Sequence, residues 1–130
     1  MAVGYSTTLR NARLDAITTA VGASGLLRIY DGTRPASGGA ATTLLAELAC
    51  SATFAPAAAA GVLTANAITQ DSSANATGTA TWARLTTSGG TFVADMAAGT
   101  AGTELILNTA SIVLAAVVTC TSCVITAGNP

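Results

Sequence analysis

Residues 61–85, on which our expectation of the fold depends, read GVLTANAITQDSSANATGTATWARL. Two runs of strand character, residues 62–69 and 79–86, lie on either side of a polar loop at 70–77. The second run contains Trp82, the single tryptophan of the chain, and the stretch lies in the middle of the sequence. We therefore expect these two strands to lie at the centre of a small β-sheet fold.

Other runs of strand character surround this centre at nearly regular spacing, at residues 26–30, 43–51, 91–96, 104–107, 111–118 and 119–126. Turn signals separate several of them, including DGTRP at 31–35 and TSGG at 87–90. Seven or eight short strands predict a mainly β fold, either an antiparallel β-sandwich of jelly-roll or immunoglobulin-like type or a barrel. Strands and helices do not alternate, so we do not expect a parallel sheet.

One helix is expected near the N-terminus, from about residue 8 to 21, with Ser6 or Thr7 as its N-cap. Its apolar face should consist of Leu9, Ala12, Ala16, Ile17, Ala20 and Val21, and its polar face of Arg10, Asn11, Asp15 and Thr18. The helix either covers an open end of its own sandwich or docks on a neighbouring subunit. We assign residues 1–24 to this helix and its lead-in, and residues 25–130 to a single β-sandwich domain.

The composition is unusually poor in charge. Of 130 residues, 51% are hydrophobic and 8% are charged, and the mean hydropathy is +0.59; globular proteins average about 25% charged residues. Either a membrane protein or a surface covered by partners would explain this. The longest apolar stretch, 105–118, contains Asn108, Thr109 and Ser111 and is shorter than the roughly 20 residues of a spanning helix, so we do not expect a membrane protein. Residues 1–6 lack the features of a signal peptide, so we expect synthesis in the cytoplasm.

The ionisable residues exclude several functions. The net charge is −1, all five basic residues are arginines, and histidine is absent. Scattered arginines predict no nucleic-acid binding, and a histidine-based catalytic triad is excluded. The glycine-rich segments lack the pattern of a phosphate-binding loop. Asp31 and Asp71 are expected to bond their own backbone in turns, and one acid per loop is too few for calcium. We expect no enzyme activity, no cofactor and no bound metal.

Three cysteines remain: Cys50, Cys120 and Cys123. The last two have the spacing of a Cys-x-x-Cys motif, but their neighbours predict a strand, on which the two thiols would point to opposite faces. They would then neither pair with each other nor form a zinc site with Cys50. They are either small fillers of the core or thiols that pair with Cys50 or with a neighbouring subunit.

The sequence resembles a family of small proteins encoded in the structural modules of tailed bacteriophages and prophages. The segments that carry this resemblance are LRIYDGTRP at 27–35, LLAEL at 44–48, GVLTANAI at 61–68, ATGTATWARL at 76–85 and ELILNT at 104–109. The resemblance covers most of the chain and brings no catalytic residues with it. It implies a component of the virion, such as a capsid decoration (cement) protein or a head–tail or tail accessory protein.

The charge-poor composition and the resemblance lead to one expectation: a non-enzymatic virion protein that stabilises the particle through subunit contacts. We expect it to be a homo-oligomer, with capsid, neck or tail proteins as its partners. Its exposed strand edges could pair with neighbouring subunits. The alternative is a fibre- or adhesin-like module that binds a cell-surface glycan. Candidate assembly contacts are Leu9, Arg10, Arg13, Ile17, Asp71 and Asn75, and candidate inter-subunit disulfides use Cys50, Cys120 or Cys123.

Overall fold

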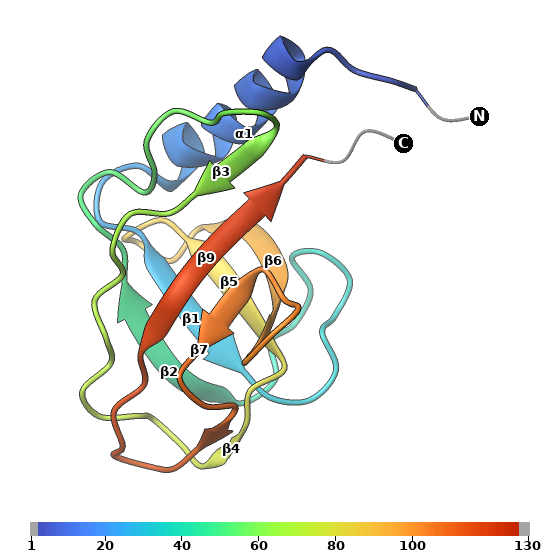
Figure 1. Ribbon diagram of the computed structural model, residues 1–130. Helices are drawn as coiled ribbons and strands as arrows, with labels where there is room; N and C mark the ends of the chain where they lie inside the picture. Colours follow the sequence, from blue (N-terminus) through green and yellow to red (C-terminus); the bar gives the residue numbers. More distant parts are fainter. Residues whose placement is uncertain (1–2, 128–130) are drawn as a thin grey trace.

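A computed structural model describes residues 3–127, which form one helix and nine strands (Figure 1). The elements, in chain order, are α1 (Thr7–Val21), β1 (Leu26–Tyr30), β2 (Leu44–Ala49), β3 (Val62–Thr64), β4 (Gly78–Thr79), β5 (Trp82–Thr86), β6 (Phe92–Gly99), β7 (Leu105–Leu107), β8 (Ser111–Ile112) and β9 (Cys120–Thr126). The expected mainly β fold with one N-terminal helix is confirmed.

Seven strands form one curled sheet in the order β2-β1-β5-β6-β7-β9-β3, and β4 pairs with β8 in a second, two-stranded sheet. The curl gives the large sheet the shape of a half-barrel (Figure 1). All neighbours are antiparallel except β6 and β7, which run parallel over two residue pairs. One short parallel pair therefore stands in the otherwise antiparallel sheet that was expected. Parallel neighbours usually need a long crossover, but here only the last two residues of β6 take part, so residues 100–104 suffice as the connection.

The core lies on the inner face of the curled sheet. On β1 and β5 every second side chain faces inward, as the strand period requires, and Leu27, Ile29, Ala83 and Leu85 are fully buried there. The surface area is 6290 Å², close to the roughly 6200 Å² expected for a folded monomer of this mass. The chain is thus about as compact as a folded monomer of its mass usually is.

The helix packs on this half-barrel through a face that only partly matches the expected one: Val21 is buried and Ile17 packs against the core, as expected, but the other four residues of that face do not. Ser6 caps α1, and Leu14 and Val21 are its buried side chains, whereas Leu9, Ala12, Ala16 and Ala20 are exposed. Two side chains of the expected polar face hold the helix to the chain before β3: Asn11 accepts from the backbone N–H of Gly61 at 2.8 Å, and Asp15 accepts from that of Ala58 at 2.7 Å. Alanine loses little by staying exposed, and these backbone groups need partners, so the polar face lies inward.

The loop at 70–77 is part of a longer structural segment, residues 65–77, which we call the closing segment. On one side it bonds to the free edge of β2, where the backbone N–H groups of Thr69 and Asn75 donate to the carbonyls of Ala49 and Leu45. On its other side, Asp71 exchanges two backbone hydrogen bonds with Val118. The β2 edge therefore has its partners within the chain, which removes it as a site for pairing with another subunit. The expected third strand ends early, at Thr64, because the chain turns to run along this edge.

A single buried strand over residues 111–118 was expected, and this expectation is wrong. Only Ser111–Ile112 forms a strand, and residues 113–116 form a tight turn closed by a 2.9 Å hydrogen bond from the N–H of Ala116 to the carbonyl of Val113. Ala115 has φ of 69°, a left-handed conformation that is uncommon for alanine. The closing segment bonds to both flanks of this turn, and this tertiary contact overrides the strand preference of its β-branched residues.

Candidate functional site

A row of charged side chains lies on the outer face of the sheet, across β2, β1, β5 and β6. Strand register places Glu47 opposite Arg28, Arg28 opposite Arg84, and Arg84 opposite Asp95. Like charges opposite each other are unfavourable, and here each arginine turns to its own acid. Arg28 Nε lies 2.8 Å from Glu47 Oε2, and Arg84 Nε lies 2.7 Å from Asp95 Oδ1. We call these four residues the charge row.

At the β5–β6 end of this row, Arg84 and Asp95 form a bidentate ion pair that is shielded from water. A second nitrogen of Arg84, Nη2, donates to Asp95 Oδ2 at 3.1 Å and to the carbonyl of Gly39 at 2.8 Å, and Asp95 also accepts from the N–H of Gly38. Burial raises the pKa of Asp95, but the hydrogen bonds from Arg84 and Gly38 and the charge of Arg84 more than offset it, and the pKa falls below its ordinary value. The hydrogen bond to Asp95 likewise raises the pKa of Arg84.

Aromatic rings extend the row and hold a loop over it. The ring of Trp82 stacks on Tyr30 with centroids 4.5 Å apart, and the Arg84 guanidinium lies 5.2 Å from the rings of both Trp82 and Phe92. Trp82 Nε1 donates to the carbonyl of Asp31 and to Thr42 Oγ1, each at 3.0 Å. Residues 31–43, which we call the covering loop, are thereby fixed at their base by Trp82 and at their middle by the ion pair.

In this arrangement the charged and aromatic side chains bond to one another and to the covering loop. The carboxylates of Asp95 and Glu47 are both neutralised by arginines, and the covering loop buries Trp82. Sequence reasoning missed the charge row, because only strand register brings the four residues together. The sequence offered one signal of the row: Arg28 and Arg84 each stand between two apolar residues on a predicted strand, and so lie on the face opposite to those residues.

The candidate contacts on α1 differ in their surroundings. Arg10 bonds within the chain, to the carbonyl of Ala127 at 3.4 Å and to Thr7 Oγ1 at 3.2 Å, and Ile17 packs against the core. Leu9 and Arg13 are exposed, and the guanidinium of Arg13 lies 5.1 Å from the ring of Tyr5. Assembly contacts through Leu9 and Arg13 stay a prediction.

The two candidate contacts in the closing segment, Asp71 and Asn75, differ in how far their side chains bond within the chain. Asp71 bonds its own backbone as expected, accepting from the N–H of Ser73, but its second oxygen accepts from the N–H of Glu47 on β2 at 2.9 Å. Asp31 instead accepts from Thr43, at the far end of the covering loop. The side chain of Asn75 is exposed, while its backbone N–H bonds to Leu45. Asp71 therefore stabilises the closure of the half-barrel.

The cysteines lie together on the inner side of the sheet, which corrects one expectation. An extra residue in β9 forms a bulge, because Cys123 pairs with Leu105 and Cys120 with Leu107. Both leucines are buried, so both thiols face the core, whereas a regular strand would have sent them to opposite faces. All three cysteines are free thiols, and Cys50 and Cys123 are buried. The partly exposed Cys120 is therefore the thiol that could form a disulfide with another subunit while the core stays closed.

Burial makes these thiols weak acids. It raises the pKa of Cys50 and of Cys120 to about 11 and, together with the neighbouring thiols and Glu104, that of Cys123 to about 12, from an ordinary value of 9.0. Above pH 9 the unfolded thiol ionises while the folded one stays protonated, so the folded state loses stability as the pH rises.

We expect the free energy of unfolding to fall by roughly 1 kcal/mol between pH 7 and pH 10 on account of Cys123 alone. Urea unfolding of the wild type and of Cys123→Ala, each at both pH values, measures this. The decrease should be smaller in the variant by that amount. An equal decrease in both proteins would contradict the assignment.

Residues 3–127 contain no pocket for a small molecule and no group of three acidic or thiol side chains placed to hold a metal ion. Within the same residues, no helix has the length and apolar character needed to cross a membrane.

Comparison with known proteins gave no match among protein-family models, curated proteins or solved structures.

Proposed function

We propose that this chain is a non-enzymatic structural protein of a tailed-phage virion, a capsid decoration or head–tail accessory protein made in the bacterial cytoplasm. Its partners are the major capsid, neck or tail proteins and further copies of itself. The observation that carries this proposal is that most charged residues bond within the chain, which leaves few charges exposed on the surface.

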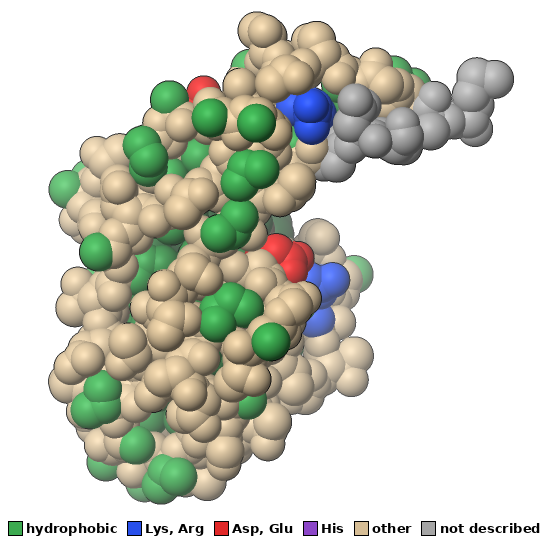
Figure 2. Space-filling model, in the orientation of Figure 1, with side chains coloured by type: hydrophobic (Ala, Val, Ile, Leu, Met, Phe, Trp, Pro, Cys, Tyr) green, Lys and Arg blue, Asp and Glu red, His purple; other side chains and the backbone are tan. Residues whose placement is uncertain are grey.

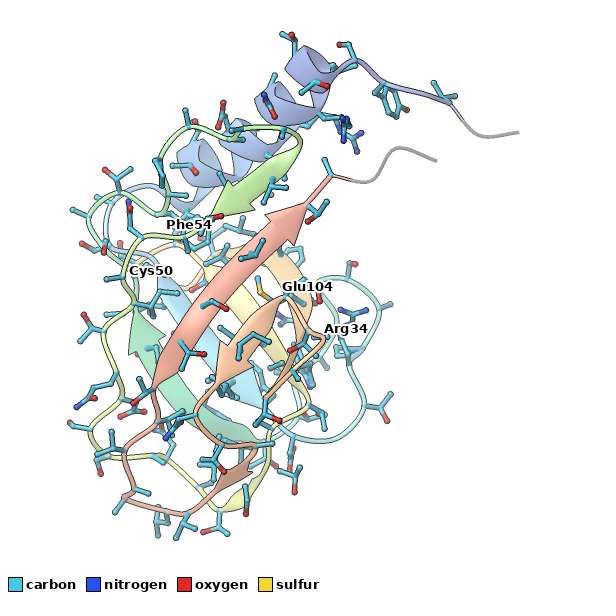
Figure 3. The ribbon with its side chains drawn as sticks, viewed as in Figure 1. Arg34, Cys50, Phe54 and Glu104 are labelled. Atoms are coloured by element: carbon cyan, nitrogen blue, oxygen red, sulfur yellow. The ribbon has the colours of Figure 1, made fainter. Side chains whose placement is uncertain are left out.

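Eight of the eleven charged residues are partly buried and serve the fold. Four form the charge row; Asp15, Asp31 and Asp71 accept backbone hydrogen bonds; and Arg10 donates to Ala127. The three charged residues that stay exposed are Arg13, Arg34 and Glu104. Figure 2 shows a face on which acidic and basic side chains are correspondingly few, and Figure 3 labels Arg34 on the covering loop and Glu104 just before β7.

Such a surface is suited to lasting contact with other proteins. Hydroxyl groups, alanines and glycines occupy most exposed positions, and burying them costs much less than burying charges. A protein placed across the joints of a shell adds buried area that must be exposed again before the shell subunits separate. Interfaces of this kind are depleted in charged residues at their centres.

No observation favours the alternative of a glycan-binding module. Trp82 and Tyr30 are buried against each other beneath the covering loop, and the two exposed rings, Tyr5 and Phe92, are each covered by an arginine, Arg13 and Arg84.

The test uses phage particles from a host strain that carries the coding sequence, with and without a deletion of it. We expect the protein to co-purify with particles through a density gradient, and the deleted particles to expose their DNA to a dye at lower temperature. Density for the half-barrel on the outside of the head or at the neck would assign its position. Absence of the protein from purified particles would overturn the proposal.

A further inference from the structure

Helix α1 is joined to the sheet by a short, strained hinge, residues 22–25. Gly22 and Ser24 both have left-handed backbones, with φ of 69° and 54°. Glycine adopts such a conformation readily, but serine does so at a cost in free energy. A Cβ atom at Gly25 would lie 2.8 Å from the carbonyl oxygen of Thr86, so the hinge lies close against β5. Within residues 3–127, no hydrogen bond of the exposed Ser24 offsets its strain.

The contacts of α1 with the rest of the chain are independent of this hinge. The helix lies beside β3 at one end of the molecule (Figure 1), and its buried side chains are Leu14 and Val21. Hydrogen bonds from Asn11, Asp15 and Arg10 join it to the residues before β3 and to the residue after β9. All three bonding partners belong to the half-barrel. The helix of a second copy would meet the same partners in the same positions.

A detached α1 needs such a second half-barrel. Within residues 3–127, the buried side-chain N and O atoms without a hydrogen-bond partner are Arg10 Nε and Thr18 Oγ1, and both gain water when the helix leaves. A lone helix of 15 residues is, however, marginal in water. Its departure would also expose the part of the core that contains Leu14 and Val21. The open monomer is therefore unstable, and an identical half-barrel offers the helix every contact that it lost.

We infer that two copies of the chain exchange α1, so that the helix of each packs on the half-barrel of the other. The exchange keeps the contacts of α1 and opens both hinges, so that Ser24 leaves its left-handed conformation. Short hinges under strain favour exchange of this kind. It ends at two copies, because both half-barrels are then covered. The inference rests on the proposed function, in which copies of the chain meet at a particle, and names the contact that joins them.

Two substitutions of Ser24 should shift the balance in opposite directions. Ser24→Gly removes the strain from the closed hinge, so it should weaken dimerisation about tenfold or more. Ser24→Pro fixes φ at about −65°, which the closed hinge does not accept. This variant should be dimeric at concentrations where the wild type is still largely monomeric. Sedimentation velocity of the full chain, refolded over a range of concentrations, measures the fraction of dimer.

The matched control is Ala115→Gly. Ala115 has a similar left-handed backbone, with φ of 69°, in the turn after β8, and Figure 1 shows the β4–β8 pair at the end of the molecule opposite α1. The change relieves strain of the same kind outside the hinge. It should therefore leave the fraction of dimer as in the wild type.

Isotope-filtered NMR distinguishes helix exchange from a side-by-side dimer. The sample is Ser24→Pro refolded from equal amounts of ¹⁵N-labelled and unlabelled chains. Asn11 Oδ1 lies 2.8 Å from the backbone nitrogen of Gly61. We therefore expect a nuclear Overhauser effect between the amide proton of Gly61 in a labelled copy and the side-chain amide protons of Asn11 in an unlabelled copy. In a side-by-side dimer this effect arises only within one copy.

Four results would overturn the inference: a wild type without dimer at any concentration, a Ser24→Pro chain that is monomeric or unfolded, a control that weakens dimerisation as Ser24→Gly does, or a dimer without the effect between copies. The proposed function can fail separately. A monomeric wild type that is found in purified particles rejects helix exchange alone, whereas a helix-exchanged dimer that is absent from particles rejects the virion role alone.

Discussion

Replacement of Asp95 by alanine should lower the free energy of unfolding by about 3–5 kcal/mol, the usual cost of removing one partner of a buried ion pair. The side chains of Asp95 and Arg84 are 3% and 13% exposed, so water cannot replace the carboxylate fully. The change also leaves the N–H of Gly38 without its acceptor. Urea unfolding followed by circular dichroism measures the loss.

The other ion pair of the charge row is the matched control, because it lies on the same face at the same level. Glu47 and Arg28 are 38% and 31% exposed, so Glu47→Ala should cost only about 0–1 kcal/mol. Replacing both Arg84 by Met and Asp95 by Leu should recover much of the loss, since no buried charge is then left alone. Equal losses for Asp95→Ala and Glu47→Ala would contradict the structural role of burial.

The pH dependence of the same variant follows from the lowered pKa of Asp95, which is held down by Arg84 and Gly38 against the opposing effect of burial. A carboxyl group with a lowered pKa stabilises the folded state above its ordinary value of 3.8, and this contribution disappears as the pH falls through the folded value. The stability difference between wild type and Asp95→Ala should therefore be constant near neutral pH and shrink in strong acid.

Replacement of Trp82 by alanine should cost about 3–5 kcal/mol and release the covering loop. The change removes a buried ring that stacks on Tyr30 and contacts Arg84, and it removes the donor that holds Asp31 and Thr42. Trp82→Phe keeps a ring and loses the N–H, so it should cost only about 1 kcal/mol.

Limited proteolysis separates loosening of the loop from general loss of stability. Elastase cleaves beside small residues, which the covering loop contains at Ala36, Ala40 and Ala41. Under conditions where Trp82→Ala is still folded, we expect cleavage in this loop to be faster than in the wild type, with Trp82→Phe between the two. A wild-type cleavage rate in Trp82→Ala would show that the loop is held by other contacts.

Residues with regular local patterns were predictable from the sequence. The alternation in Leu26–Tyr30 and the Ser6 cap before α1 gave the strand and the helix, because strand period and helix capping depend on neighbouring residues alone. The burial of Trp82 was also predicted, but the expectation that both strands of residues 61–85 lie at the centre was wrong for the first: β5 lies inside the sheet, whereas β3 is its edge strand. Composition indicated a surface with little charge.

Contacts between distant residues could not be predicted in the same way. Glu47, Arg28, Arg84 and Asp95 lie far apart in the chain, and only strand register makes them one row. A single bulge in β9 decided that Cys120 and Cys123 both face the core, because one extra residue reverses the face of every side chain beyond it.

Sequence by itself thus determined the class of the fold, the single helix and the shortage of free charge, all of which depend on composition and local periodicity. Tertiary structure alone decided which face of α1 is buried, that the closing segment occupies the β2 edge, and that residues 113–116 form a tight turn instead of part of a buried strand. The physical reason is the same in each case: backbone groups and apolar surface take the partners that the whole fold offers, and these outweigh the modest local preferences of a few residues.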